Sequence, residues 1–387
     1  MLLLGSTTFF VFGIVLILLG ATQAELARDL GLDLSATGLL GSVLALGLGI
    51  GVLIAGPLSD HWPRKPVFVG ASVLTAVALL AVNRVHGYGA LVGLLLVIGV
   101  GCGAYDTIIN AAVVERYAAR ASSALALVHA SATLGACIGP GLIQLMGRAG
   151  HWSDAFHALG YAHCGLIAWG VSADWSRAPS VSGELDVAPH SRRWLTSPAL
   201  FALCVIGFAY VGAESGLTLF AIPWALARAE SERAGQLCIS AFWFGLALGR
   251  LMLAARTPRR GLLWLSASGW LGALILTVAN ALPIGPLAAA TALAGVALGP
   301  VYPLMIAQAA QRFRRATGTA VGVVAGAGAA GGFAVPWLVG TLGDAQGVRA
   351  GIALLTGHVL LIAAAAVVRT QLKPRVRPRT RTRVASA

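Results

Sequence analysis

Long apolar runs alternate with short polar stretches from the start of the chain to about residue 370. Each run is roughly 20 residues long, which is the length of α-helix that crosses the hydrocarbon core of a bilayer. No basic residues precede the first run, so we expect an uncleaved span rather than a signal peptide. The pattern predicts twelve membrane-spanning helices, at residues 6–24, 36–58, 66–83, 88–114, 122–146, 154–173, 197–225, 233–255, 260–281, 286–311, 317–343 and 348–370.

The composition supports an all-α membrane protein and excludes a set of soluble domains. Hydrophobic residues make up 58% of the 387 residues and charged residues only 11%. The mean hydropathy is +0.83, whereas a soluble domain has about 25% charged residues. The five cysteines lie in apolar stretches without a CxxC spacing, so we expect no disulfide framework, metal site or cofactor.

The basic residues predict the orientation of the spans. Thirteen Lys and Arg residues lie in the loops after even-numbered spans and six in the loops after odd-numbered spans, with seven more from Arg369 to Arg383. The positive-inside rule therefore places both termini and the loops after even-numbered spans in the cytoplasm. We expect the protein to lie in the inner (cytoplasmic) membrane. Because these charges lie in loops and in one tail, we expect contact with lipid and no binding of nucleic acid.

Small residues recur at a nearly constant offset along the chain. The matching pairs are Gly99 and Gly295, Gly103 and Gly299, Gly135 and Gly331, and Pro140 and Pro336 at 196 residues, with Gly47 and Gly245, and Gly51 and Gly249, at 198. Such a repeat predicts two six-helix halves with the same fold. We expect an N-terminal half at 1–173, a central cytoplasmic loop at 174–196, a C-terminal half at 197–370 and a basic tail at 371–387.

The loop after the second span reads Gly56-Pro-Leu-Ser-Asp60-His-Trp-Pro-Arg64-Lys65. Together with the two halves, it resembles the signature of the major facilitator superfamily between its second and third helices. His61 stands where that signature usually has Arg, and Pro63 where it has Gly. The resemblance implies the major facilitator fold and a cytoplasmic conformational latch formed by Gly56, Asp60, Arg64, Lys65 and Arg116.

Two acids and one arginine lie well inside predicted spans rather than in loops or at helix ends. Asp106 lies in the fourth span, Glu214 in the seventh and Arg250 in the eighth. Charged groups inside a bilayer are costly and usually functional. Arg250 is close enough to a helix end for its long side chain to extend to the interface instead. Asp106 and Asn110 are four residues apart and share one face of their helix.

Four segments resemble the fucose–proton symporter family and its relatives. They are the glycine-rich start followed by Asp106 and Asn110; His129 with Gly135 and Gly139-Pro140; Gly299-Pro-Val-Tyr-Pro303; and Tyr210-Val-Gly-Ala-Glu214. The chain departs from this family at two points. The Trp expected about six residues after Glu214 is ten residues away, at Trp224. The first span offers Gln23 where the symporter has an acid.

The resemblance and the buried acids together favour a proton-coupled secondary active transporter that works by alternating access. Burial disfavours a charged carboxyl group, so Asp106 and Glu214 are the candidates to bind and release protons. The solute would be a small polar molecule, a sugar or sugar derivative, carried by a monomer. Candidate solute contacts are Asn110, Gln23, Tyr210, Tyr302, Phe242, Trp243 and Trp270, although Trp and Tyr also populate membrane interfaces.

The alternative function is a proton-coupled exporter, or antiporter, of amphipathic or drug-like compounds. The apolar composition and Gly139-Pro140 in the fifth span are compatible with it. We do not expect an enzyme, since the sequence shows no nucleophile–base arrangement and no phosphate-binding loop.

Overall fold

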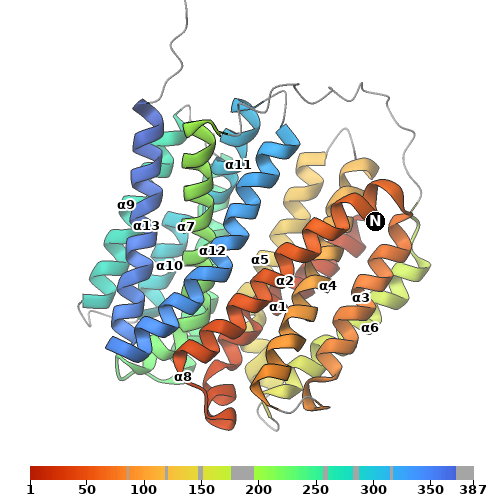
Figure 1. Ribbon diagram of the computed structural model, residues 1–387, viewed down its shortest axis with the longest axis horizontal. Coiled ribbons are helices and arrows are strands. Elements are labelled where there is room, and N and C mark those ends of the chain that lie inside the picture. Colours follow the sequence, from red (N-terminus) through yellow and green to blue (C-terminus); the bar gives the residue numbers. More distant parts are fainter. Residues whose placement is uncertain are drawn as a thin grey trace, which may run out of the picture.

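The computed structural model describes residues 1–84, 87–117, 121–146, 151–175, 196–255, 260–281, 287–313 and 317–371. Within these ranges the chain is helical (Figure 1). The helices are α1 (Leu2–Leu30), α2 (Leu34–His61), α3 (Arg64–Leu80), η1 (Val82–Arg84), α4 (Tyr88–Arg116), α5 (Ala121–Met146), α6 (Ser153–Ser172), α7 (Pro198–Leu226), α8 (Glu232–Ala255), α9 (Gly261–Ala281), α10 (Leu287–Leu298), α11 (Val301–Arg312), α12 (Thr317–Gln346) and α13 (Val348–Gln371).

The twelve predicted spans each correspond to helical structure, with one correction. The tenth span is not a continuous helix over 286–311, because α10 ends at Leu298 and α11 begins at Val301. Pro300 has no backbone N–H to donate, which removes a hydrogen bond from this turn of the helix. Ten segments of the described chain are long and apolar enough to cross a membrane, and these include 287–309 as one segment.

The helices form two halves that lie side by side (Figure 1). In the first half α2 packs against α4 and α1 against α5; in the second, α8 packs against α10 and α7 against α12. The end of the bundle with the turn between α1 and α2 is called here the Asp33 end. The opposite end, with the turn between α2 and α3, is called the Arg64 end, and both described termini point toward it.

The glycine pattern marks the same helix crossing in both halves. Gly99 of α4 lies against the carbonyl oxygen of Leu44, so closely that a Cβ atom would not fit. Gly295 of α10 lies against the carbonyl oxygen of Phe242 in the same way. Leu44 and Phe242 are 198 residues apart, which confirms the repeat predicted from the sequence. Small residues let the helix backbones approach each other at these points.

The halves contact each other through α2 with α12, α5 with α8, and α1 with α7. Many of the bonds between them lie near the Asp33 end. The carboxylate of Asp344, at the end of α12, accepts hydrogen bonds from the backbone N–H groups of Leu34 (2.9 Å) and Ser35 (2.7 Å) in the first turn of α2. Further along the same pair of helices, the backbone N–H of Trp337 donates to Ser42 Oγ at 3.1 Å. These contacts join the two halves at this end of the bundle.

Parts of two predicted segments lie outside the described residues. The predicted central loop is described only at residues 174–175 and 196, and the predicted basic tail only at Gln371. The side chains of Asp60 and His61 also lie outside the description. The boundaries of the two halves therefore stay predictions at these points.

Candidate functional site

Four side chains from three helices meet between the halves. Arg250 of α8 donates from Nη1 to Thr133 Oγ1 of α5 at 3.0 Å and from Nη2 to the hydroxyl oxygen of Tyr210 of α7 at 3.2 Å. The Tyr210 hydroxyl in turn donates to Glu214 Oε2 at 2.5 Å. Glu214 Oε2 also lies 3.8 Å from Arg250 Nη2. We call these four residues, Thr133, Tyr210, Glu214 and Arg250, the Arg250 cluster.

The Arg250 cluster is assembled by helix register. Tyr210 and Glu214 are four residues apart on α7, so their side chains lie one above the other. Glu214 is 12 residues from Leu226, which is about 18 Å along the axis from the nearer end of α7. The side chain of Arg250 contacts Thr133 and Tyr210, so its guanidinium is held inside the bundle by two helices instead of standing free near the end of α8.

The Arg250 cluster is buried only in part. Tyr210 and Thr133 are buried, with 1% and 4% of their surface exposed. The side chains of Arg250 and Glu214 are 30% and 19% exposed. The Nε atom of Arg250 is buried and has no hydrogen-bond partner among the described residues. The cluster therefore combines a guanidinium that is bonded to two neighbouring helices with a carboxylate that is partly accessible to solvent.

A second carboxyl group lies on α4, in the other half. Asp106 accepts a hydrogen bond from Asn110 Nδ2 at 3.3 Å, as their four-residue spacing predicts. Asp106 is ten residues from Arg116, about 15 Å from the nearer end of α4. The other amide atom, Asn110 Oδ1, is buried without a partner in the described chain. An amide oxygen left in this state is a ready acceptor for a proton donor on a solute or water.

Tyr302 lies between these two sites. Its ring centroid is 6.0 Å from that of Tyr210, and it lies within electrostatic range of Asp106, Glu214 and Arg250. Tyr302 belongs to the first turn of α11, directly after the break at Gly299–Pro300. Discontinuous helices at mid-membrane are typical of transporter binding sites.

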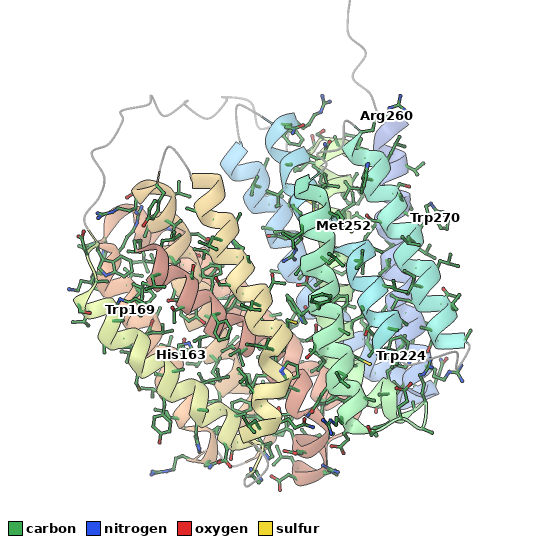
Figure 2. All side chains as sticks on the ribbon, turned by 180° about the vertical axis from the view of Figure 1, so that it is seen from behind. His163, Trp169, Trp224, Met252, Arg260 and Trp270 are labelled. Carbon is green, nitrogen blue, oxygen red and sulfur yellow. The ribbon has the colours of Figure 1, made fainter. Side chains whose placement is uncertain are left out.

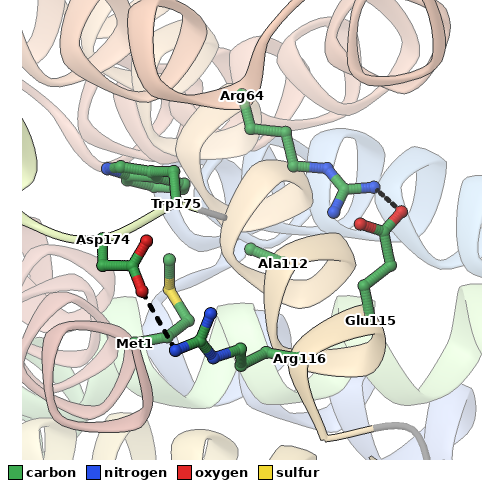
Figure 3. Close-up of a pocket in the computed structure, with 7 residues that line it drawn as sticks. All are labelled: Met1, Arg64, Ala112, Glu115, Arg116, Asp174 and Trp175. Atoms are coloured by element: carbon green, nitrogen blue, oxygen red, sulfur yellow. Dashed lines mark hydrogen bonds and ion pairs between the residues drawn. The ribbon is translucent and has the colours of Figure 1, made fainter. Parts of the chain in front are cut away.

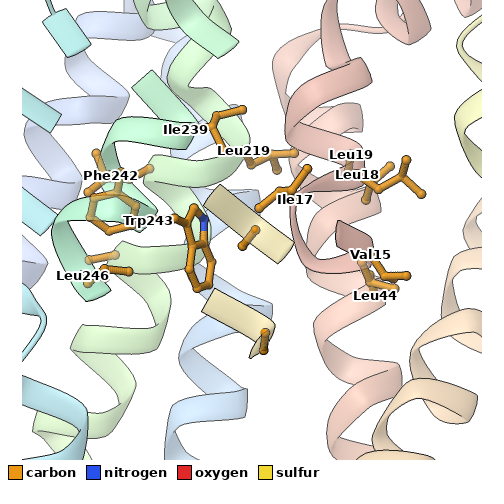
Figure 4. Packing of buried hydrophobic residues seen from close by; sticks show 14 of the residues in the cluster. Val15, Ile17, Leu18, Leu19, Leu44, Leu219, Ile239, Phe242, Trp243 and Leu246 are labelled. Atoms are coloured by element: carbon orange, nitrogen blue, oxygen red, sulfur yellow. The ribbon is translucent and has the colours of Figure 1, made fainter. Parts of the chain in front are cut away.

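Four other candidate solute contacts remain. Gln23 is 2% exposed and donates to Thr37 Oγ1 at 3.0 Å, between α1 and α2. Phe242 and Trp243 pack in the hydrophobic core (Figure 4), where Trp243 Nε1 donates to Thr218 Oγ1 at 3.2 Å. Trp270 is 61% exposed on the outer surface of α9 (Figure 2). The structure thus groups Asn110, Tyr210 and Tyr302 with the acids, and it places Trp243 against Thr218, one turn from Glu214 on α7. Gln23 bonds instead to α2, and Trp270 faces outward.

Two residues of the site were absent from the predicted set. Arg250 is an isolated charge in an apolar helix, and this isolation is the sequence signal for a role. Thr133 carried no such signal, because threonine is common in membrane helices and its partner is 117 residues away. His129, one turn before Thr133, stacks edge-on against Phe9 with ring centroids 5.0 Å apart.

Two residues of the predicted latch, Arg64 and Arg116, form ion pairs at the Arg64 end (Figure 3). Arg64 pairs with Glu115 and donates to the carbonyl oxygen of Ala111 at 3.3 Å. Arg116 Nη2 pairs with Asp174 Oδ2 at 3.0 Å. These groups line a small pocket together with Met1 and Trp175. Lys65 is exposed, and a Cβ atom at Gly56 would meet open space.

The fold and the site define a class of protein. Helices of membrane length in two similar halves, with charged groups between the halves, are the arrangement of a multi-pass membrane transporter. The Major Facilitator Superfamily model matches residues 3–249. The chain belongs to this family, which consists of transporters and not enzymes.

Curated relatives match a limited part of the chain. It is 30% identical over 140 residues to the uncharacterized MFS-type transporter YfkL of Bacillus subtilis (strain 168), which is 36% of this chain and 35% of YfkL. It is 29% identical over 147 residues to the probable sulfoacetate transporter SauU of Cupriavidus necator, which is 38% of this chain and 34% of SauU. The matched segments span about a third of the length of these relatives.

Solved structures match nearly the whole chain. A bacterial homologue of the human lysosomal transporter Spinster, in an inward-facing and unoccupied conformation, has a TM-score of 0.78 at 16% identity, covering 96% of each chain. The D-xylose–proton symporter has a TM-score of 0.72 at 14% identity, covering 96% and 97%. The nucleoside transporter NupG has 0.70 at 16%, covering 96% and 98%. At these identities the similarity shows the fold alone.

Proposed function

We propose that this protein is a proton-coupled secondary active transporter of a small polar solute, a sugar or sugar derivative, which it moves by alternating access. One observation carries the proposal. Each half holds a carboxyl group far from its helix ends, Asp106 in α4 and Glu214 in α7, and each is hydrogen-bonded to a side chain one turn away.

The cost of burying charge explains how these groups would couple proton movement to solute movement. A carboxylate inside a membrane protein is destabilised unless it is paired or protonated. Asp106 is hydrogen-bonded to the neutral amide of Asn110, so a change of conformation that removes water would favour its protonated form. Proton entry supplies about 2.3 kcal/mol per 100 mV for each charge that crosses the membrane.

The orientation follows from the basic loops. The positive-inside rule assigns the Arg64 end to the cytoplasm and the Asp33 end to the outside of the inner membrane. The bonds between Asp344 and the start of α2 then hold the outer side closed. The similar Spinster homologue was solved in an inward-facing conformation, which agrees with a form of this chain that is open toward the cytoplasm.

The names of the relatives support a small polar solute. They include a D-xylose–proton symporter, a nucleoside transporter and a probable sulfoacetate transporter. We assign this chain to the same broad kind of cargo.

The test uses purified protein in proteoliposomes with an imposed proton gradient. A panel of sugars and sugar acids is compared with a panel of lipophilic cations. Alkalinisation of the outside that depends on a sugar or sugar acid supports symport. Release of protons from the inside that depends on a lipophilic cation would indicate an exporter and refute the proposal.

The coupling residue is tested by Asp106→Asn. This change keeps a hydrogen-bonding side chain beside Asn110 but cannot take up a proton. We expect gradient-driven accumulation to be lost and solute exchange between equal pools to remain. Glu25→Gln, which changes an exposed carboxylate of α1, is the matched control and should accumulate solute normally. Normal accumulation by Asp106→Asn would refute the coupling assignment.

A further inference from the structure

We propose that the transported solute carries an anionic group, such as a carboxylate, that binds the guanidinium of Arg250, and that Glu214 takes up a proton when it does. This inference rests on the proposed transport function and names the class of solute: a sugar acid or a comparable small organic anion.

The guanidinium of Arg250 has more donors than partners. Arginine offers five N–H donors in a planar fork, and two of the bonds described here go to the neutral hydroxyl groups of Thr133 and Tyr210. The buried Nε has no partner among the described residues. Such a fork matches the two oxygens of a carboxylate and binds them through parallel hydrogen bonds.

The ion pair with Glu214 leaves room for a competitor. Its shortest distance, 3.8 Å between Glu214 Oε2 and Arg250 Nη2, is beyond hydrogen-bond length. Oε2 instead accepts from the Tyr210 hydroxyl at 2.5 Å. An ion pair inside a protein needs close, hydrogen-bonded geometry for its attraction to offset the loss of hydration. Here both side chains stay partly exposed.

Charge balance links the anion to a proton. The cluster now holds one positive and one negative charge, so its net charge is zero. An added anion would bring the net charge to −1 in a medium that stabilises charge poorly. If the Glu214 carboxylate binds one proton and becomes a carboxylic acid, the loaded cluster is neutral again. No covalent bond to the solute forms or breaks in this step.

Among the titratable groups near Arg250, Glu214 is the one that would accept the proton. Arg250 of α8 and Tyr210 of α7 contact it, and Tyr302 of α11 lies within electrostatic range. His129 of α5 lies within electrostatic range of Arg250, and a second positive charge there is unfavourable. Asp106 of α4 lies within electrostatic range of Tyr302 and belongs to a separate hydrogen-bonded pair. A neutral sugar would add no charge to the Arg250–Glu214 pair. The Glu214 carboxylate would then stay ionised beside the guanidinium.

The binding test compares acids with their neutral counterparts. The thermal unfolding midpoint of the purified protein is measured between pH 5.5 and 8 with D-gluconate, D-glucuronate or glycolate, and with D-sorbitol, D-glucose or ethylene glycol. We expect at least one acid to stabilise the protein, more strongly at the lower pH, and its neutral counterpart not to. Stabilisation by neutral compounds alone, or by no acid of the panel, would overturn the proposal.

Variants separate the roles of the two charges. Arg250→Lys keeps the charge but loses the fork, and should weaken binding of the acid by about tenfold or more. The double change Arg250→Gln with Glu214→Gln leaves no unpaired charge, so it should fold and bind no acid. Glu214→Gln alone mimics the protonated residue, and its binding should no longer depend on pH.

A second arginine–glutamate pair between the halves provides the matched control. Arg28 and Glu232 lie 2.9 Å apart at the Asp33 end, and both are more exposed than the Arg250 pair. Arg28→Gln should leave acid binding unchanged. An equal loss in Arg28→Gln and Arg250→Lys would overturn the assignment of the anion to Arg250.

Transport distinguishes failure of this inference from failure of the proposed function. Gradient-driven accumulation of glucose but not of gluconate or glucuronate would refute the anionic solute while supporting proton coupling. Arg250-dependent binding of an acid without any accumulation driven by the gradient would support the anionic solute and refute proton coupling.

Discussion

Replacing Asp344 by asparagine should open the Asp33 end of the bundle. The first N–H groups of a helix have no partner within the helix. In α2, Asp33 caps the N–H of Ala36 at 2.7 Å, whereas the N–H groups of Leu34 and Ser35 bond to Asp344 of the other half. The start of α2 is therefore fully capped only while the two halves are in contact.

The size of the effect follows from these bonds. Losing a capping side chain costs about 1 kcal/mol, and a negative charge at a helix N-terminus contributes about 0.3–1 kcal/mol where it is exposed, as Asp344 is. Together they give about 1–2 kcal/mol, which raises the ratio of open to closed molecules roughly 5- to 30-fold. Asparagine keeps some hydrogen bonding, so Asp344→Asn should lie at the lower end and Asp344→Ala at the upper end.

Spin labels report this opening directly. Labels at Leu30→Cys and Gln346→Cys, in a background without the five native cysteines, place one probe on each half at the Asp33 end. Double electron–electron resonance then gives the populations of short and long distances. Asp154→Asn is the matched control, because Asp154 accepts a backbone N–H bond of 2.9 Å from His151 within one half. Unchanged distance populations in Asp344→Asn and Asp344→Ala would refute the capping argument.

Two further predictions concern the repeated helix crossing and the broken helix. Gly295→Ala forces a Cβ against the carbonyl oxygen of Phe242 and should lower the free energy of unfolding in detergent by about 1–3 kcal/mol. Gly93→Ala is the control, because its Cβ meets open space and should not destabilise the protein. Equal effects of the two changes would contradict the close helix crossing. Pro300→Ala allows α10 and α11 to join into one helix, so the unfolding midpoint should be unchanged or higher. Because the joined helix would move Tyr302, transport should be slower. Unchanged transport kinetics would show that the break has no role.

The sequence predicted the helices and the repeat well because both depend on local patterns. Apolar runs of bilayer length mark the spans, and Gly99 and Gly295 mark the same crossing in each half. The break at Pro300 was missed because proline is tolerated within membrane helices, as Pro140 of α5 shows. The sequence alone did not indicate that this proline, unlike Pro140, would divide its span.

The site was predicted less completely because it depends on contacts between the halves. Asp106, Asn110 and Glu214 could be found from their burial in apolar spans and their spacing on one helix. The bond between Arg250 and Thr133 joins two helices from different halves, and no local pattern encodes that register. Gln23 was selected as a polar residue in an apolar span, but its partner proved to be Thr37 of the neighbouring helix.

The two acids inside the membrane-spanning helices have different partners, which suits them to different tasks. The hydrogen bond described for Asp106 comes from a neutral amide, so protonation at this site leaves no cation unbalanced. Glu214 lies beside a guanidinium, and its protonation leaves the charge of Arg250 without a counter-ion in a medium where that is costly. A proton can therefore load Asp106 alone, whereas it loads Glu214 readily only when another anion reaches Arg250. Under this arrangement Asp106 responds to the proton gradient and Glu214 makes proton uptake conditional on the solute.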